Sequence, residues 1–229
     1  KLRRSFMVRR SKSILKLPPK RHQLLPLPQE GLVKLVEAEM TAAQRVKAAL
    51  AAFEGLGAPV EPEEPYTGLY EALERRFGAW QDRTYQDCLQ YLSTPEQVAF
   101  EEMSEARKAL AAAKIPMVVE HLESTLATGV KVIVFVVHTE MAEALRKRFP
   151  DAGFVTGKTP MNKRQSEVDR FQEDDGCRLF IGNIVAAGTG FTMTAATVVV
   201  FAELDWVPAR MEQAEDRAWR RGQSNAVLV

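Results

Sequence analysis

The alternation of short apolar strands with amphipathic helices in the second half of the chain restricts its fold more than any other feature. Runs rich in β-branched residues predict buried strands at 131–138, near 154, at 178–183, at 197–201 and at the C-terminal end. Helical periodicity between these runs predicts helices at 116–127, 139–149, 160–172 and 208–221. This rhythm is typical of the α/β class, a parallel sheet with helices on both faces.

The predicted strand ends carry residues that suit phosphate binding. Ligands of parallel sheets bind beyond the carboxyl ends of the strands, and His138, the loop 184–190 and the segment 203–206 follow such ends. Gly188 and Gly190 would let backbone amides approach a ligand closely, and threonine hydroxyls in the same loop can bond phosphate oxygens. His138 is equally compatible with a structural role.

Two arginines near the C-terminal end, Arg217 and Arg220, are three residues apart within the predicted helix 208–221. That spacing predicts that both side chains share one helical face, with Gln213 one turn upstream. The guanidinium group is planar, permanently charged and bidentate toward phosphate, so the pair predicts a phosphate-gripping site. The alternative is a solvated charged face with salt bridges inside the helix.

The first half of the chain is predicted to be largely helical. Apolar spacing predicts a long helix over 30–54 and a helical packing face over 66–92, with a proline-rich acidic loop between them. Thr94 and Pro95 are typical of a helix start, and we expect that helix to end at Pro116. The predicted organisation is a basic linker at 1–29, a helical protrusion at 30–113 and an α/β lobe at 114–229.

Taken in order, these segments resemble the C-terminal RecA-like motor lobe of Swi/Snf-type superfamily-two DNA translocases and helicases. The resemblance is carried by Leu-Pro-Pro-Lys at 17–20, a Gly-x-x-x-x-x-x-Arg-x-x-x-x-x-x-Phe block at 157–171, a Gly-x-Gly loop at 188–190, Asp-Trp-x-Pro at 205–208 and Gln-Ala-x-Asp-Arg-x-x-Arg-x-Gly-Gln at 213–223. The segments 113–116 and 201–204 favour the HARP-like annealing-helicase branch. Trp219 departs from the family pattern, which usually has His there.

The resemblance implies a role for each group of candidate residues. Arg217 and Arg220 would be catalytic arginine fingers directed at ATP. The residues implied in ATP binding are Gly188, Gly190, Gln213 and Asp216. The residues implied in contacts with the backbone of duplex DNA are His138, Gly157, Lys158, Thr159, Thr189 and Trp206. Trp206 is equally compatible with packing at the strand–helix junction.

The sequence contains neither a Walker A loop nor an Asp-Glu pair after a strand. ATP and Mg²⁺ would therefore be bound mainly by the first RecA-like lobe of the same full-length chain, and no metal ligands are predicted here. The chain alone is expected to be inactive, with duplex DNA and the first lobe as its partners and no oligomer. Two other functions stay open: an RNA helicase lobe, and a non-catalytic scaffold that binds a protein through helices 30–113.

Composition adds few limits. With 31 Lys and Arg against 30 Asp and Glu the net charge is +1, so no global basic field marks a nucleic-acid binder, although residues 1–22 are basic and lack acids. Cys88 and Cys177 lack metal-ligand spacing. No apolar run approaches the ~20 residues of a membrane span, and we expect an intracellular, DNA-associated protein, cytoplasmic or in a nucleoid or nucleus. A first residue other than Met and an ending within a predicted strand favour a fragment of a longer chain.

Overall fold

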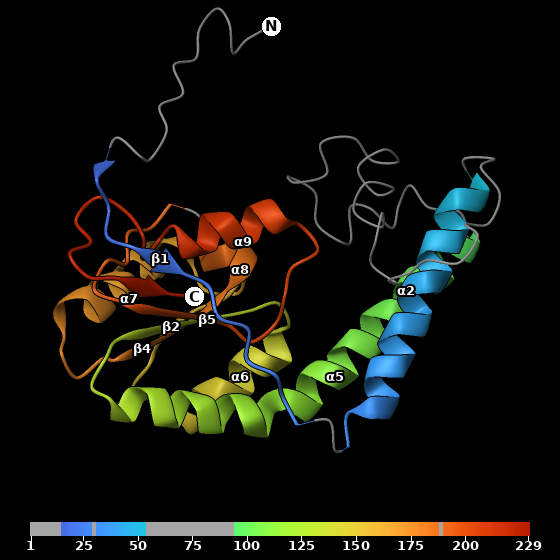
Figure 1. The fold of residues 1–229 in the computed structure, drawn as a ribbon, viewed down its shortest axis with the longest axis horizontal. Coiled ribbons are helices and arrows are strands. Elements are labelled where there is room, and N and C mark those ends of the chain that lie inside the picture. Colours follow the sequence, from blue (N-terminus) through green and yellow to red (C-terminus); the bar gives the residue numbers. More distant parts are fainter. Residues whose placement is uncertain (1–14, 29–30, 54–93, 188–189) are drawn as a thin grey trace, which may run out of the picture.

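The computed structural model describes residues 15–28, 31–53, 94–187 and 190–229. Its centre is a six-stranded sheet with the order β1-β6-β5-β2-β4-β3, in which neighbouring strands are parallel (Figure 1). The strands are β1 (Lys20–Arg21), β2 (Val132–Val136), β3 (Gly153–Val155), β4 (Leu179–Asn183), β5 (Val198–Phe201) and β6 (Val227–Leu228). The predicted α/β class with a parallel sheet is confirmed.

The interior strand β2 explains why this sheet needs helices on both faces. All of its side chains are fully buried, at 0% exposure. Alternate residues point to opposite faces, so Val132 and Val134 join one apolar cluster while Ile133 and Phe135 join another. A strand that is apolar on both sides leaves no face for water and must be covered twice.

Helices supply that cover. α6 (Thr139–Arg148) and the C-terminal part of α5 (Thr94–Ala127) pack on one face, as Leu145 and Leu122 in one cluster indicate. The other face is covered by α7 (Met161–Glu173), α8 (Ile184–Ala187) and α9 (Pro208–Glu215). Figure 1 shows the two layers, with α5 and α6 below the sheet and α9 above it.

The helix α5 corrects one prediction. A helix ending at Pro116 and a second one at 116–127 were expected, but α5 runs without a break from Thr94 to Ala127. Pro116 is exposed, and its missing N–H costs a helical bond without burying an unsatisfied group. The helix bends along its length instead of ending (Figure 1).

A two-helix arm extends from the sheet. α2 (Val33–Phe53) lies beside the N-terminal part of α5, and we call α2 with residues 94–115 the arm (Figure 1). Its interface is built from alanines that allow close approach and from larger apolar side chains. These include Ala42, Ala43, Val46, Phe100 and Met103. The helical packing face predicted at 66–92 lies outside the described residues.

The segment after α9 corrects a second prediction. A helix was expected over 208–221, but α9 ends at Glu215. Residues 216–222, which we call the arginine turn, form successive turns, with Gly222 at a φ of 102°. The Arg217 carbonyl accepts the Met193 N–H at 2.9 Å instead of continuing a helical ladder. Tertiary bonds thus override the local helix propensity, and the two arginines do not lie on a helix.

None of the helices in the described part of the chain is both long enough and apolar enough to cross a membrane.

Candidate functional site

The register of the sheet brings residues predicted to contact DNA, and one predicted to bind ATP, to the carboxyl ends of the strands. Val136 of β2 lies opposite Asn183 of β4, and Val155 of β3 opposite Gly182. Phe135 lies opposite Phe201 of β5, so all four strands end at the same level. The candidate residues that follow these ends are His138, Gly157, Lys158, Thr159, Gly190 and Trp206. Gly188 and Thr189 lie outside the described residues.

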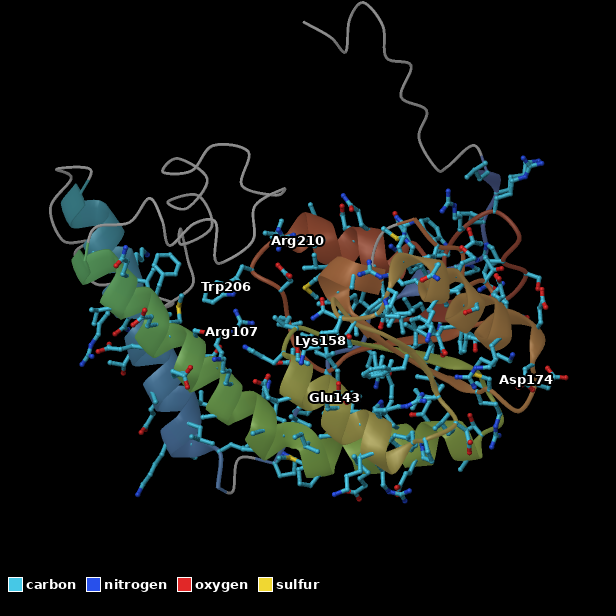
Figure 2. The ribbon with its side chains drawn as sticks, turned by 180° about the vertical axis from the view of Figure 1, so that it is seen from behind. Arg107, Glu143, Lys158, Asp174, Trp206 and Arg210 are labelled. Carbon is cyan, nitrogen blue, oxygen red and sulfur yellow. The ribbon has the colours of Figure 1, made fainter. Side chains whose placement is uncertain are left out.

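Figure 2 shows this edge facing the arm. Lys158 and Trp206 lie toward the arm, whereas Asp174 marks the opposite, amino-terminal edge of the strands. Lys158 and Trp206, which follow different strands, therefore both lie on the side of the lobe that faces the arm.

His138 is held by a buried carboxylate. The Glu203 side chain is 5% exposed and accepts hydrogen bonds from the backbone N–H groups of Val137 and His138 at 2.9 and 3.0 Å. It also accepts a bond from His138 Nδ1. Because a carboxylate only accepts, this contact places the hydrogen on Nδ1 and leaves Nε2 as the ring's other polar atom.

The electrostatics of Glu203 follow from the same contacts. Burial alone would raise the pKa of the Glu203 carboxyl, but the bonds from His138 and Val137 outweigh it, and the pKa lies below its ordinary value. Glu203 is thus an ionised structural anchor for the end of β2. Asn183 supports the same segment, since its Nδ2 donates to the Val137 carbonyl at 2.6 Å.

The turn after β3 is closed by its own residues. The Thr156 N–H donates to Thr159 Oγ1 at 3.0 Å, and the Thr159 N–H donates to the Thr156 carbonyl at 3.1 Å. The Thr159 hydroxyl is therefore engaged as an acceptor. Lys158 is exposed at the tip of the turn. A Cβ added at Gly157 would meet nothing within 4 Å, so the fold itself does not require glycine there.

Arg164 of α7 ties this turn to α8. Its guanidinium donates to the carbonyls of Thr159 at 2.9 Å, Gly157 at 3.3 Å and Ala186 at 3.5 Å. Five fixed donors on one planar group suit such a junction of several carbonyls. Arg164 is the arginine of the block at 157–171, and nothing in the sequence indicates this role.

The two candidate catalytic arginines converge although they do not share a helix. Arg217 Nη1 and Arg220 Nη1 both donate to the Phe191 carbonyl, at 3.3 and 3.5 Å. Arg217 Nε also donates to the Gln213 carbonyl at 2.9 Å. Among the described residues neither guanidinium forms an ion pair. Two cations sharing one neutral acceptor leave most of their donors available for an anion.

The charge balance around Arg217 supports that conclusion. Burial lowers the pKa of the Arg217 guanidinium, the charge of Arg220 lowers it further, and Asp216 partly opposes both. An arginine remains protonated after such a shift, so an incoming anion would relieve the repulsion. Gln213 and Gly190 are exposed in the neighbouring segments, and Asp216 lies at the end of α9.

Trp206 contacts the arm. The Arg107 guanidinium of α5 lies 4.2 Å from the centre of the Trp206 ring and donates to the Leu204 carbonyl. Val207, next to Trp206, is fully buried in the cluster of arm residues. Trp206 thus packs at the junction of the arm and the β5–α9 loop, and this contact with Arg107 was missed because nothing in the sequence links position 107 to 206.

A metal site of protein ligands is not formed in the described part of the chain, which holds no cluster of three His, Cys, Asp or Glu residues. The donors at the arginine turn and at the strand ends are cations, hydroxyls and amides. Such a set of donors fits phosphate oxygens.

Comparison with known proteins identifies the fold. Residues 113–222 match the helicase conserved C-terminal domain family. The chain is 43% identical over 103 residues to a Caenorhabditis elegans homolog of the SWI/SNF-related matrix-associated actin-dependent regulator of chromatin subfamily A-like protein 1. Residues 113–222 thus form a helicase conserved C-terminal domain that is similar to those of SWI/SNF-related proteins.

Other relatives agree with this assignment. The lobe is 38% identical over 127 residues to the mouse DNA annealing helicase and endonuclease ZRANB3. The C. elegans alignment covers 43% of this chain and 15% of the relative, and the mouse alignment covers 53% and 12%. The chain thus spans a small part of the curated relatives it matches. The crystal structure of the C-terminal part of the Fun30 ATPase domain shares the fold, with a TM-score of 0.51, 19% identity and coverage of 93% of this chain and 84% of that one.

Proposed function

We propose that this helicase C-terminal lobe is the second motor lobe of an ATP-dependent translocase of double-stranded DNA, in the chromatin-remodelling or annealing-helicase class. The observation that carries the proposal is the pair of guanidinium groups of Arg217 and Arg220, which meet at one neutral carbonyl without a carboxylate partner among the described residues. The relatives named as chromatin regulators and as annealing helicases support the same class.

In this proposal Arg217 and Arg220 act on the substrate ATP, which is bound together with Mg²⁺ mainly by the first RecA-like lobe of the full-length chain. When the lobes close, the two cations neutralise the charge that develops on the transferred phosphoryl group. An arginine finger contributes a rate factor of ~10³–10⁵, or about 4–7 kcal/mol of the barrier. The contribution requires that the contact be stronger in the transition state than in bound ATP.

Residues next to the two arginines form the rest of the proposed ATP-binding site. Gly190, with a φ of 85° and open space around it, would present its backbone close to the nucleotide. Gln213 fixes Arg217 through its carbonyl and offers a side-chain amide. Asp216 reduces the mutual repulsion of the two arginines. Gly188 belongs to the same proposed site.

The DNA side of the proposal uses the carboxyl edge of the sheet. Lys158 is an exposed cation, and the open space at Gly157 would let a DNA phosphate approach the backbone. His138 would contribute Nε2, since Nδ1 is bonded to Glu203. Thr159, Thr189 and Trp206 belong to the same proposed surface. These groups contact phosphates without a base-reading element, so binding would be indifferent to sequence. The protein would be DNA-associated, in a nucleus or nucleoid.

The test uses the full-length protein that contains this lobe. Arg217→Ala and Arg220→Ala should each lower the DNA-stimulated kcat for ATP by ~10³ or more, with a smaller change in KM. Lys at either position should not restore the rate, because it lacks the bidentate contact. Arg221→Ala, an exposed neighbour, is the matched control and should keep wild-type turnover. Normal turnover of the Arg217 or Arg220 variant would refute the finger role.

A further inference from the structure

The strand β1 holds the N-terminal segment of the lobe next to the arginine turn. Lys20 and Arg21 pair in parallel with Val227 and Leu228 at the sheet edge. The pairing extends beyond the strand, since the Gln23 N–H donates to the Val229 carbonyl at 2.7 Å. These are backbone bonds, so a substitution of the Lys20 side chain leaves the strand in place.

The Lys20 side chain reaches across to the end of α9. Its Nζ lies 2.5 Å from Glu215 Oε1 and 3.7 Å from Asp216 Oδ1. The Lys20 and Glu215 side chains are 16% and 7% exposed. Partial removal from water strengthens an ion pair and also makes the loss of one partner costly. The same ammonium lies 4.7 Å from the centre of the Trp219 ring.

Two further contacts join the same segments. Trp219 Nε1 donates to the Pro18 carbonyl at 2.7 Å, and His22 Nε2 donates to Glu215 Oε2 at 2.7 Å. Pro18, Lys20 and His22 thus contact the turn at both Glu215 and Trp219. Arg217 lies between these two anchored residues and is held with them.

The arginine turn depends on such contacts because it lacks a helical ladder of its own. Its backbone is closed by single turns, such as the bond from the Arg217 N–H to the Ala214 carbonyl at 3.1 Å. The anchors at Glu215 and Trp219 hold the backbone from which the Arg217 side chain reaches the Gln213 and Phe191 carbonyls. We propose that Lys20, acting through Glu215 and Trp219, is a positioning residue that sets the direction of the Arg217 and Arg220 guanidinium groups. The inference rests on the proposed function of the two arginines.

The experiment again uses the full-length protein. Lys20→Met removes the ammonium and keeps an unbranched stem over Trp219, whereas Lys20→Arg keeps a cation. Misplacing a catalytic group by about 1 Å costs ~10²-fold, so Lys20→Met should lower the DNA-stimulated kcat ~10- to ~100-fold with little change in the KM for ATP or in DNA affinity. Lys20→Arg should recover most of the rate. Lys147→Met is the control, since Lys147 is an exposed lysine of α6 that is distant in sequence from both Lys20 and the arginine turn. This variant should behave as wild type.

The outcomes separate the inference from the function on which it rests. Wild-type kcat in Lys20→Met, or a rise in KM alone, would overturn the positioning role while the arginine variants still lose activity. Wild-type turnover in both arginine variants would instead overturn the proposed function. If Lys20→Met melts too early to be assayed, Glu215→Gln keeps the size of the side chain and one acceptor oxygen but removes its charge. The same loss of kcat is expected there, and its absence would refute the inference.

Discussion

Arg107 and Trp206, which are far apart in sequence, lie against each other with the guanidinium 4.2 Å from the centre of the indole ring. Arg107 also donates to the Leu204 carbonyl and lies 3.6 Å from Glu39 Oε1. In Figure 2 both side chains lie where the arm meets the edge of the lobe. One side chain of the arm thus holds the loop that leads from β5 into α9.

Replacement of Arg107 should therefore destabilise the lobe. A cation–π contact contributes about 0.5–2 kcal/mol and a hydrogen bond from a charged group about 1.5–3 kcal/mol, so Arg107→Ala should lower the unfolding free energy by about 2–5 kcal/mol. Urea denaturation measures this change. Arg45→Ala is the control, since its pair with Glu102 is exposed and should cost less than about 1 kcal/mol. Equal losses in the two variants would contradict the linking role of Arg107.

The Glu203 anchor should make stability depend on pH. Its pKa is lowered in the folded lobe, whereas an unfolded glutamate titrates at about 4.3. The carboxylate therefore stabilises the fold fully above about pH 5, and that stabilisation is lost as the pH falls through the folded pKa. Melting curves should show the largest deficit of Glu203→Gln near neutral pH and a shrinking deficit below about pH 4. A constant deficit across this range would show that the carboxylate charge does not matter.

Lys158 should contribute to DNA affinity through charge alone. Binding of duplex DNA to this lobe should weaken as salt rises and should not depend on sequence. Lys158→Ala should weaken binding to all duplexes equally and reduce the salt slope by about one counterion. Titrations at several salt concentrations test this. Lys147→Ala on α6 provides a matched loss of one charge, and an equal effect there would point to net charge rather than to the site.

Two glycines should respond in opposite ways to alanine. Gly157 has no positive φ and open space, so Gly157→Ala should leave stability unchanged or raise it by about 0.4–1 kcal/mol. Gly190 has a φ of 85°, where a side chain costs about 1–2 kcal/mol. Thermal unfolding measures both. If Gly157 serves close approach of phosphate, its alanine variant should nevertheless bind DNA more weakly, and unchanged affinity would remove that role.

The sequence predicted the parts of the fold that depend on local pattern. The apolar runs at 131–138 and 178–183 predicted the two interior strands β2 and β4, because a strand buried on both faces leaves a continuous β-branched signal. The edge strand at Lys20–Arg21 gave no such signal, since two polar residues pair through their backbone alone. Pro116 was taken as a helix end because the pattern cannot show that a helix will bend at an exposed proline.

For the candidate site, the sequence can be compared with the structure only in where the residues lie. Residues placed after predicted strands, such as His138 and Lys158, lie at one edge because parallel strands end together. Helical spacing predicted that Arg217 and Arg220 lie close together. They do so on a non-helical turn, where both guanidinium groups donate to the Phe191 carbonyl. The partners Glu203, Arg164 and Arg107 were not assigned because their contacts join segments distant in sequence.

The pairing of β1 with β6 also bears on how the lobe behaves when it is shortened. A chain that began at residue 24 would lose the strand that covers the outer side of Val227 and Leu228. Unpaired backbone groups at a sheet edge are a template for pairing with another molecule. Forms of this lobe that lack residues 18–23 should therefore self-associate through β6 more readily than forms that keep them.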